Sequence, residues 1–158
     1  MSLLEGLLAN IGPVDSQAGK AAQTRLDSLT KPPGSLGRLE DLAVQLAAIT
    51  GRARPSFPRK VVYTLAGDHG ISAEGVSAYP AEVTPQMVAN FLNGGAAINV
   101  LARRAGATVV VADLGVAAPL KAHPHLVNLR VASGTKNFSR EPAMSRQEAI
   151  QAIDAGIS

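Results

Sequence analysis

The chain has 158 residues, a formal net charge of +3 and 46% hydrophobic but only 3% aromatic residues. This length suits a packed domain that buries roughly 70% of the surface of its unfolded chain. The absence of cysteine excludes disulfide frameworks, thiolate catalysis and cysteine-ligated zinc or iron–sulfur clusters. With no apolar run of the roughly 20 residues that a membrane span needs, and no signal-peptide pattern, we expect a cytoplasmic protein that binds no membrane.

The charge is mild and gives no indication of nucleic-acid binding. The basic residues are scattered, and their densest cluster lies at residues 52–60. A nucleic-acid groove needs a row of stacking rings along a basic stripe, and this chain has few rings. We therefore expect no nucleic-acid partner.

The N-terminal third of the sequence is predicted to be helical. Leucines at helical spacing predict an amphipathic helix over residues 3–30. Pro32 and Pro33 cannot lie inside a helix, so they separate it from a second one. Ser35 is the expected N-cap of that second helix, which ends at Gly51.

Three segments are predicted to be strands. The segments 60–66 and 108–113 are nearly continuous apolar runs, as in parallel strands that are covered on both faces. The segment 126–132 alternates more and is expected nearer an edge of the sheet.

Helices are predicted between and after these strands. Thr84 and Pro85 form an expected N-cap and N1 pair, and Asn93-Gly94-Gly95 divides the helical region that follows. A second helical piece covers residues 96–105. Ser145 and Glu148 form a capping box at the start of a last helix, which reaches about Ala155. Alternating strands and helices predict an α/β fold with a mostly parallel sheet and right-handed crossovers.

Each predicted strand ends in a polar turn that contains glycine. In open parallel sheets, ligands bind outside the carboxyl ends of the strands, and glycine lets backbone amides approach them closely. These turns should therefore share one edge of the sheet and form a small-molecule site. They are Gly67-Asp68-His69-Gly70, Asp113-Leu114-Gly115 and Ser133-Gly134-Thr135-Lys136-Asn137.

The histidines permit a metal site but do not favour one. Asp68 and His69 have no third ligand at a recognisable spacing, and His123-Pro124-His125 is expected in a surface loop. A capped turn explains the first pair more simply. A metal-dependent hydrolase that uses these residues with Asp113 remains an alternative.

The long loop at residues 75–87 is the other unusual segment. Neither a Walker P-loop nor a G-x-G-x-x-G nor a G-x-S-x-G motif occurs in the chain. Long loops in compact domains are usually functional or mobile. Tyr79, Pro80, Gln86 and Met87 could form the walls of a slot for a flat aromatic ligand, with Gln86 orienting it.

The chain resembles a known family over nearly all its length, from about Leu26 onward. The motifs are LDSLTKPPGSLGRLEDLA, AGDHGISAEGVSAYPAEVTPQMVANFLNGGAAINVLARRAGA, VVVADLGV and GTKNFSREPAMS. They resemble the N-terminal part of nicotinate-nucleotide–dimethylbenzimidazole phosphoribosyltransferases. The resemblance implies a Rossmann-like α/β domain, of which residues 60–158 are expected to be the N-terminal part, with residues 1–52 belonging to a smaller helical domain.

The resemblance also implies an activity. The family transfers phosphoribose from nicotinate mononucleotide to 5,6-dimethylbenzimidazole, which gives α-ribazole 5′-phosphate and nicotinate in cobalamin biosynthesis. It implies a homodimer with no cofactor and no metal. The family's general base is a glutamate of the C-terminal half, and none of the six glutamates here matches that motif. We therefore expect this chain alone to be inactive, and a non-catalytic module that binds an aromatic base is the alternative.

Positions that match the family's motifs give the expected site residues. Tyr79, Pro80, Gln86 and Met87 form the walls of the benzimidazole pocket, and Asp68 and His69 form its floor. Ser133, Gly134, Thr135 and Asn137 are expected on the ribose-phosphate side. Tyr79 departs from relatives that carry a smaller residue there, so its ring should narrow the slot and affect which base fits.

Overall fold

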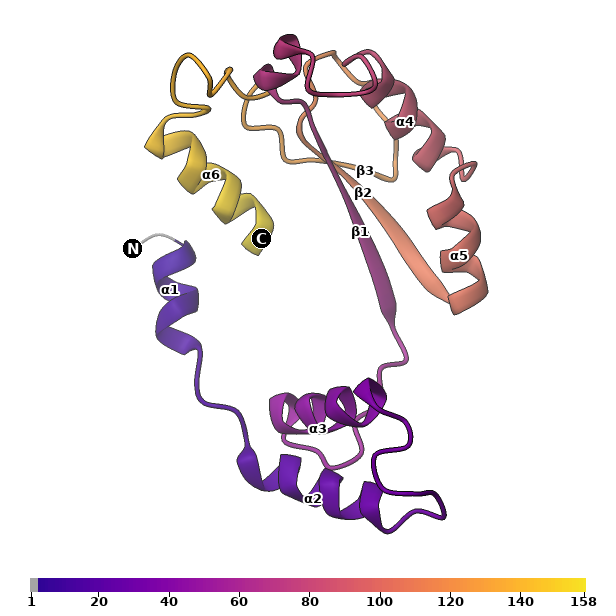
Figure 1. The fold of residues 1–158 in the computed structure, drawn as a ribbon. Helices are drawn as coiled ribbons and strands as arrows, with labels where there is room; N and C mark the ends of the chain where they lie inside the picture. Colours follow the sequence, from indigo (N-terminus) through magenta and orange to yellow (C-terminus); the bar gives the residue numbers. More distant parts are fainter. Residues whose placement is uncertain (1–2) are drawn as a thin grey trace. The chain divides into compact units, whose positions relative to one another are not determined.

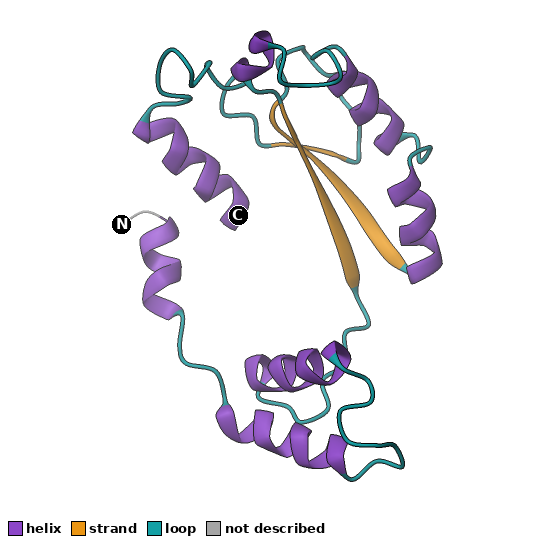
Figure 2. Cartoon of the chain, viewed as in Figure 1, coloured by secondary structure: helices purple, strands orange, loops and turns teal. Residues whose placement is uncertain are grey.

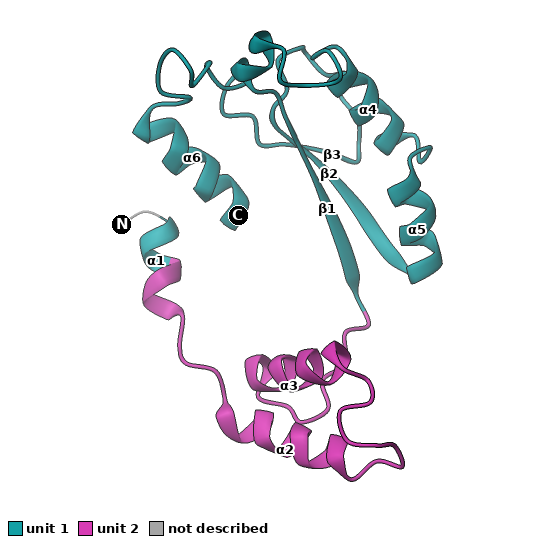
Figure 3. Ribbon diagram, in the orientation of Figure 1, with its two compact units in different colours: residues 1–6, 59–158 teal, residues 7–58 magenta. Residues whose placement is uncertain are grey.

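A computed structural model describes residues 3–158 (Figure 1). The chain forms two compact units, one of residues 7–58 and one of residues 59–158 with the first residues of the chain (Figure 3). The assignment of residues 1–52 to a smaller domain remains a prediction. Among the described residues, no helix is long and apolar enough to cross a membrane.

The N-terminal region contains two helices where the sequence predicts one over residues 3–30. They are α1 (Leu3–Asn10) and α2 (Ser16–Asp27). The single-helix prediction is wrong because Pro13 interrupts the helical pattern and Asp15 starts a new helix. The Asp15 carboxylate accepts hydrogen bonds from the backbone N–H groups of Gln17 and Ala18, at 2.8 and 3.0 Å, which satisfies two otherwise unpaired donors of α2.

Helix α3 (Arg38–Thr50) packs against α2 in the smaller unit. Its N-cap is Gly37 rather than the predicted Ser35, because tight turns occupy residues 32–37. Gly51 ends the helix in the left-handed conformation, φ 65°, as the sequence predicts.

The larger unit contains a parallel three-stranded sheet in the order β1-β2-β3, which confirms the α/β fold class (Figure 2). The strands are β1 (Lys60–Gly67), β2 (Ala107–Gly115) and β3 (Leu126–Asn128). β3 is shorter than predicted: the Asn128 side chain accepts from the N–H of Arg130, which turns the chain out of the regular ladder.

Helices lie between β1 and β2 and after β3 in the larger unit. They are η1, a 3₁₀ helix (Gly70–Glu74), α4 (Val83–Leu92), α5 (Ala97–Ala105) and α6 (Arg146–Ile157). Glu82, not Thr84, precedes α4, so the predicted cap is displaced by two residues. The capping box of Ser145 and Glu148 forms as predicted.

The core of the larger unit lies between α4 and one face of the sheet. Val88 of α4 packs with Val111 and Val116, and all three are almost fully buried. The alternate residues of β1 point to the other face and stay exposed in this chain, at 46% for Val61, 68% for Tyr63 and 59% for Leu65. The prediction that β1 is covered on both faces therefore holds for one face only.

Candidate functional site

The turns that follow β1 and β2 and the segment at residues 133–137 are joined directly by backbone hydrogen bonds. The N–H of Asp68 donates to the carbonyl of Gly115 at 2.9 Å, and the N–H of Thr135 donates to the carbonyl of Asp68 at 3.0 Å. The N–H of Gly70 returns a bond to the carbonyl of Thr135 at 3.0 Å. The predicted meeting of these turns at one edge of the sheet is confirmed.

Glycine is required at one of these contacts. Gly134 has φ +83°, and a Cβ there would lie 3.2 Å from the carbonyl oxygen of Asp68. Only glycine combines this left-handed backbone with so close an approach. The turn can therefore lie directly against the segment that follows β1.

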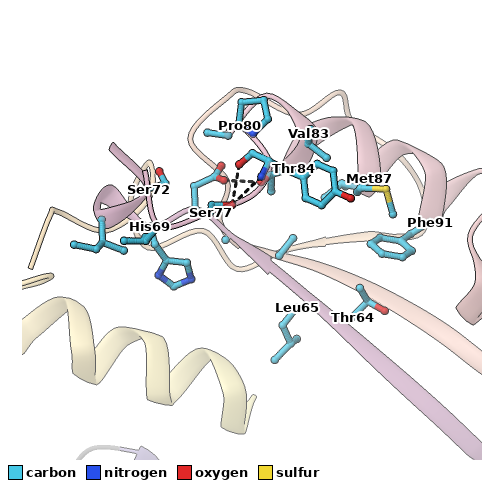
Figure 4. A pocket seen from close by; sticks show the side chains of 18 residues that line it. Thr64, Leu65, His69, Ser72, Ser77, Pro80, Val83, Thr84, Met87 and Phe91 are labelled. Atoms are coloured by element: carbon cyan, nitrogen blue, oxygen red, sulfur yellow. Dashed lines mark hydrogen bonds between the residues drawn. The ribbon is translucent and has the colours of Figure 1, made fainter. Parts of the chain in front are cut away.

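The Asp68 carboxylate bonds α4 and makes a second bond to the segment that follows β2. Its Oδ1 accepts from the hydroxyl of Thr84 at 2.6 Å, and its Oδ2 accepts from the N–H of Ala117 at 2.7 Å. His69 differs from it: in residues 3–158 no hydrogen bond to its imidazole is found, and the ring points away from Thr84 (Figure 4).

A cavity of about 570 Å³ opens at the carboxyl end of β1 (Figure 4). Five of the six predicted pocket residues line it, namely Asp68, His69, Tyr79, Pro80 and Met87. The tyrosine is 71% exposed and so lies at the rim. Apolar side chains of α4 form much of the remaining wall, including Val83, Val88 and Phe91, and the strand residues 64–67 border it.

Gln86, the sixth predicted residue, lines a different cavity. In α4, successive side chains are rotated by roughly 100°, so Gln86 and its neighbour Met87 project to different sides. Gln86 lies with Pro119, Leu120 and His123 in a cavity of about 510 Å³. The prediction treats residues 75–87 as one loop, and that treatment hides the rotation.

The helical period also reveals wall residues that the prediction missed. Thr84, Met87, Val88 and Phe91 follow one another at helical spacing along α4, and all four line the cavity. From the sequence, Thr84 is predicted only as a helix cap. The same spacing applied to residues 83–92 would have placed it in the wall.

A second cavity, of about 390 Å³, lies on the other side of the segment that follows β1. The two cavities share residues 65–69 as a common wall. Gly134 and Thr135, two of the four residues expected on the ribose-phosphate side, line the second cavity, and Lys136 and Glu148 add charge to it.

The other two residues predicted on that side make structural bonds instead. The Ser133 hydroxyl accepts from Arg130 at 2.8 Å, and the Asn137 amide donates to Glu74 at 2.6 Å. Neither residue lines the second cavity.

Two charged groups of the second cavity, Lys136 and Glu148, have shifted pKa values. A hydrogen bond and an ion pair with Glu141, at 2.7 Å, raise the pKa of Lys136 above its usual range. Hydrogen bonds from the backbone N–H and the hydroxyl of Ser145 lower the pKa of Glu148. At neutral pH Lys136 and Glu148 therefore add one ammonium and one carboxylate group to the cavity, which the Asp68 carboxylate also lines.

The histidine pair gives no metal centre. His123 and His125 have ring centroids 5.5 Å apart, and the N–H of His125 donates to Nδ1 of His123 at 3.2 Å. Within residues 3–158, no three His, Asp or Glu side chains are grouped closely enough to hold a metal ion.

The fold and the cavities define an α/β protein with a two-part cavity at the carboxyl end of its first strand. A family model described as "Phosphoribosyltransferase" matches residues 11–158. The chain belongs to this phosphoribosyltransferase family.

Named relatives agree with this membership. The chain is 60% identical to the nicotinate-nucleotide–dimethylbenzimidazole phosphoribosyltransferases of Chloroflexus aggregans and of a Roseiflexus species, over all of this chain and 45% of each relative. A crystal structure of the Thermus thermophilus protein of that name superposes on 90% of this chain and 43% of its own, with a TM-score of 0.84 and 51% identity. The chain thus spans less than half the length of these relatives.

Proposed function

We propose that this chain supplies the base-binding part of an enzyme that transfers phosphoribose from nicotinate mononucleotide to 5,6-dimethylbenzimidazole, in cobalamin biosynthesis. One observation carries the proposal: an apolar cavity of about 570 Å³ shares residues 65–69 with a second, charged cavity. The first would hold the flat base between Met87 and the segment that follows β1. The second would hold the phosphoribosyl side, near Thr135 and Lys136.

The reaction needs little beyond positioning. A ring nitrogen of the benzimidazole forms a bond to C1′ while the bond from C1′ to the cationic pyridine nitrogen breaks, so nicotinate leaves as a neutral ring. A base takes the N–H proton of the benzimidazole. Holding the incoming base in line with C1′, on the face opposite the leaving ring, inverts the anomeric centre.

The general base is proposed to come from residues outside this chain. Both carboxylate oxygens of Asp68 already accept hydrogen bonds, and no glutamate of residues 3–158 lines the first cavity. The relatives are more than twice as long as this chain, which leaves room for a base elsewhere. We therefore propose that the chain alone binds the benzimidazole but does not catalyse the transfer.

We further propose a cytoplasmic homodimer. The exposed apolar residues Val61, Tyr63 and Leu65 on one face of β1 support association with further protein surface. A non-catalytic module that binds an aromatic base would use the same first cavity. A turnover assay with an added C-terminal fragment of a relative separates this alternative from the proposed enzyme.

The methionines provide a direct binding test. The chain has three, of which Met87 lines the first cavity and Met144 the second. In a chain labelled with ¹³C at the methionine methyl groups, 5,6-dimethylbenzimidazole should shift the Met87 signal saturably and leave the Met144 signal in place. A shift of Met144 alone, or of neither, would overturn the proposal.

The catalytic part of the proposal needs a second assay. With nicotinate mononucleotide and 5,6-dimethylbenzimidazole, this chain alone should form no α-ribazole 5′-phosphate. Adding a C-terminal fragment of a relative should restore product. Robust product from the chain alone would show that the general base lies within these 158 residues. Failure of the fragment to restore product would favour the non-catalytic module.

A further inference from the structure

Asp68 joins four segments of the larger unit through four hydrogen bonds. Its backbone bonds Gly115 and Thr135, and its carboxylate accepts from the Thr84 hydroxyl at 2.6 Å and the Ala117 N–H at 2.7 Å. We propose that Asp68 is a positioning residue that sets the width of the base pocket through Thr84, rather than bonding the base with its own carboxylate. This inference rests on the proposed function.

The position of Thr84 explains how Asp68 can act on the pocket. Thr84 lies in the first turn of α4, on the same side of the helix as Met87 and Phe91, and all three line the first cavity. The bond to Asp68 ties this turn to the segment that follows β1, which forms the opposite wall (Figure 4). Loss of the bond should let α4 shift relative to Leu65 and His69.

The bonding pattern argues against an acid–base role for Asp68. A general base must reach the proton that it takes, and each oxygen of this carboxylate is already directed at a protein donor. An asparagine could keep both bonds. Its carbonyl would accept from Ala117, and its amide would donate to the Thr84 hydroxyl, which can donate or accept.

The test compares Asp68→Asn, Asp68→Ala and Thr84→Val by calorimetric titration with 5,6-dimethylbenzimidazole. Asp68→Ala and Thr84→Val should each raise the Kd about tenfold, and the double variant should be no weaker than Asp68→Ala, because both changes remove the same bond. Asp68→Asn should stay within about threefold of the unchanged chain. Equal losses for Asn and Ala, or additive losses in the double variant, would overturn the proposal.

A ligand-free measurement separates this inference from the proposed function. In the free chain, Asp68→Ala and Thr84→Val should shift the Met87 methyl signal in the same direction. Asp68→Asn should change the Met87 signal little, and the Met144 signal should change little in all three variants. If the unchanged chain fails to bind the benzimidazole, the proposed function fails, and these shifts still test the link. Thr84→Val replaces one hydroxyl by a methyl group, so it serves if Asp68→Ala does not fold. An unshifted Met87 signal in Thr84→Val would overturn the inference.

Discussion

Gly70 lies against Asn137 so closely that a Cβ on the glycine would be 2.6 Å from the backbone nitrogen of Asn137. The same Cβ would be 2.7 Å from the carbonyl oxygen of Thr135. Backbone atoms cannot move aside as the end of a long side chain can. The segment that follows β1 and the turn at residues 133–137 are therefore packed backbone to backbone, beside the wall that the two cavities share.

Gly70→Ala should destabilise the larger unit. Overpacking of this kind typically costs about 1–3 kcal/mol, which lowers the melting temperature of a domain of this size by several degrees. Gly156→Ala in α6 is the matched control, because a Cβ there meets nothing within 4 Å. Thermal unfolding followed by circular dichroism gives the comparison, and equal melting temperatures for the two variants would contradict the close contact.

Asp113 gives a second stability prediction. This buried residue, 4% exposed, accepts at Oδ1 from the N–H groups of Gly115 at 2.9 Å and Val116 at 2.8 Å. Asp113→Ala leaves both donors buried without a partner, at a cost of roughly 2 kcal/mol or more. Asp113→Asn keeps an acceptor oxygen and should cost less than half as much. Urea unfolding measures both, and equal losses would mean that these two bonds do not stabilise the turn.

The regular elements were predictable because their signals are local. The apolar runs of β1 and β2 and the left-handed glycine Gly51 at the end of α3 identify their elements within a few residues. The helix starts were harder. The Thr84 hydroxyl resembles a cap in sequence, yet it bonds Asp68, which lies 16 residues earlier. Sequence spacing does not reveal which of two partners a polar side chain takes.

The site was predictable to the level of segments but not of side chains. Parallel strands bring their carboxyl ends to one edge, so the meeting of Asp68 with Gly115 follows from topology. The separation of Gln86 from Met87 comes from the rotation of roughly 100° between neighbouring residues of α4, which is lost when residues 75–87 are read as one loop. A shift of one residue along a helix turns a side chain away from the ligand.

The smaller unit should show a specific dependence on pH. Glu40, 5% exposed, accepts from Lys31 at 2.8 Å and from the N–H of Leu36, and these bonds lower the pKa of its carboxyl in the folded chain. Above the ordinary value of about 4.3 the carboxylate is charged in both states, and its stabilisation is fully present. As the pH falls through the lowered pKa of Glu40 in the folded chain, protonation of the carboxylate removes this stabilisation.

Glu40→Gln isolates this contribution. The difference in unfolding free energy between the unchanged chain and Glu40→Gln should be largest at neutral pH and should shrink as the pH falls below about 4. Asp41→Asn removes a charge from the same turn of α3 without breaking the pair with Lys31, and its effect should be smaller. A difference for Glu40→Gln that stays constant with pH would contradict the assignment.

Two adjacent residues of α4 test which side of the helix meets the base. Met87 lines the first cavity and Gln86 the neighbouring one, so the two variants differ in the cavity that they change. Met87→Ala removes apolar contact and should raise the Kd for 5,6-dimethylbenzimidazole roughly five- to tenfold, as expected for losing about 1 kcal/mol of apolar contact. Gln86→Ala should leave it within about twofold. If Gln86→Ala weakens binding more than Met87→Ala in calorimetric titration, the base occupies the cavity beside Pro119 and Leu120 instead.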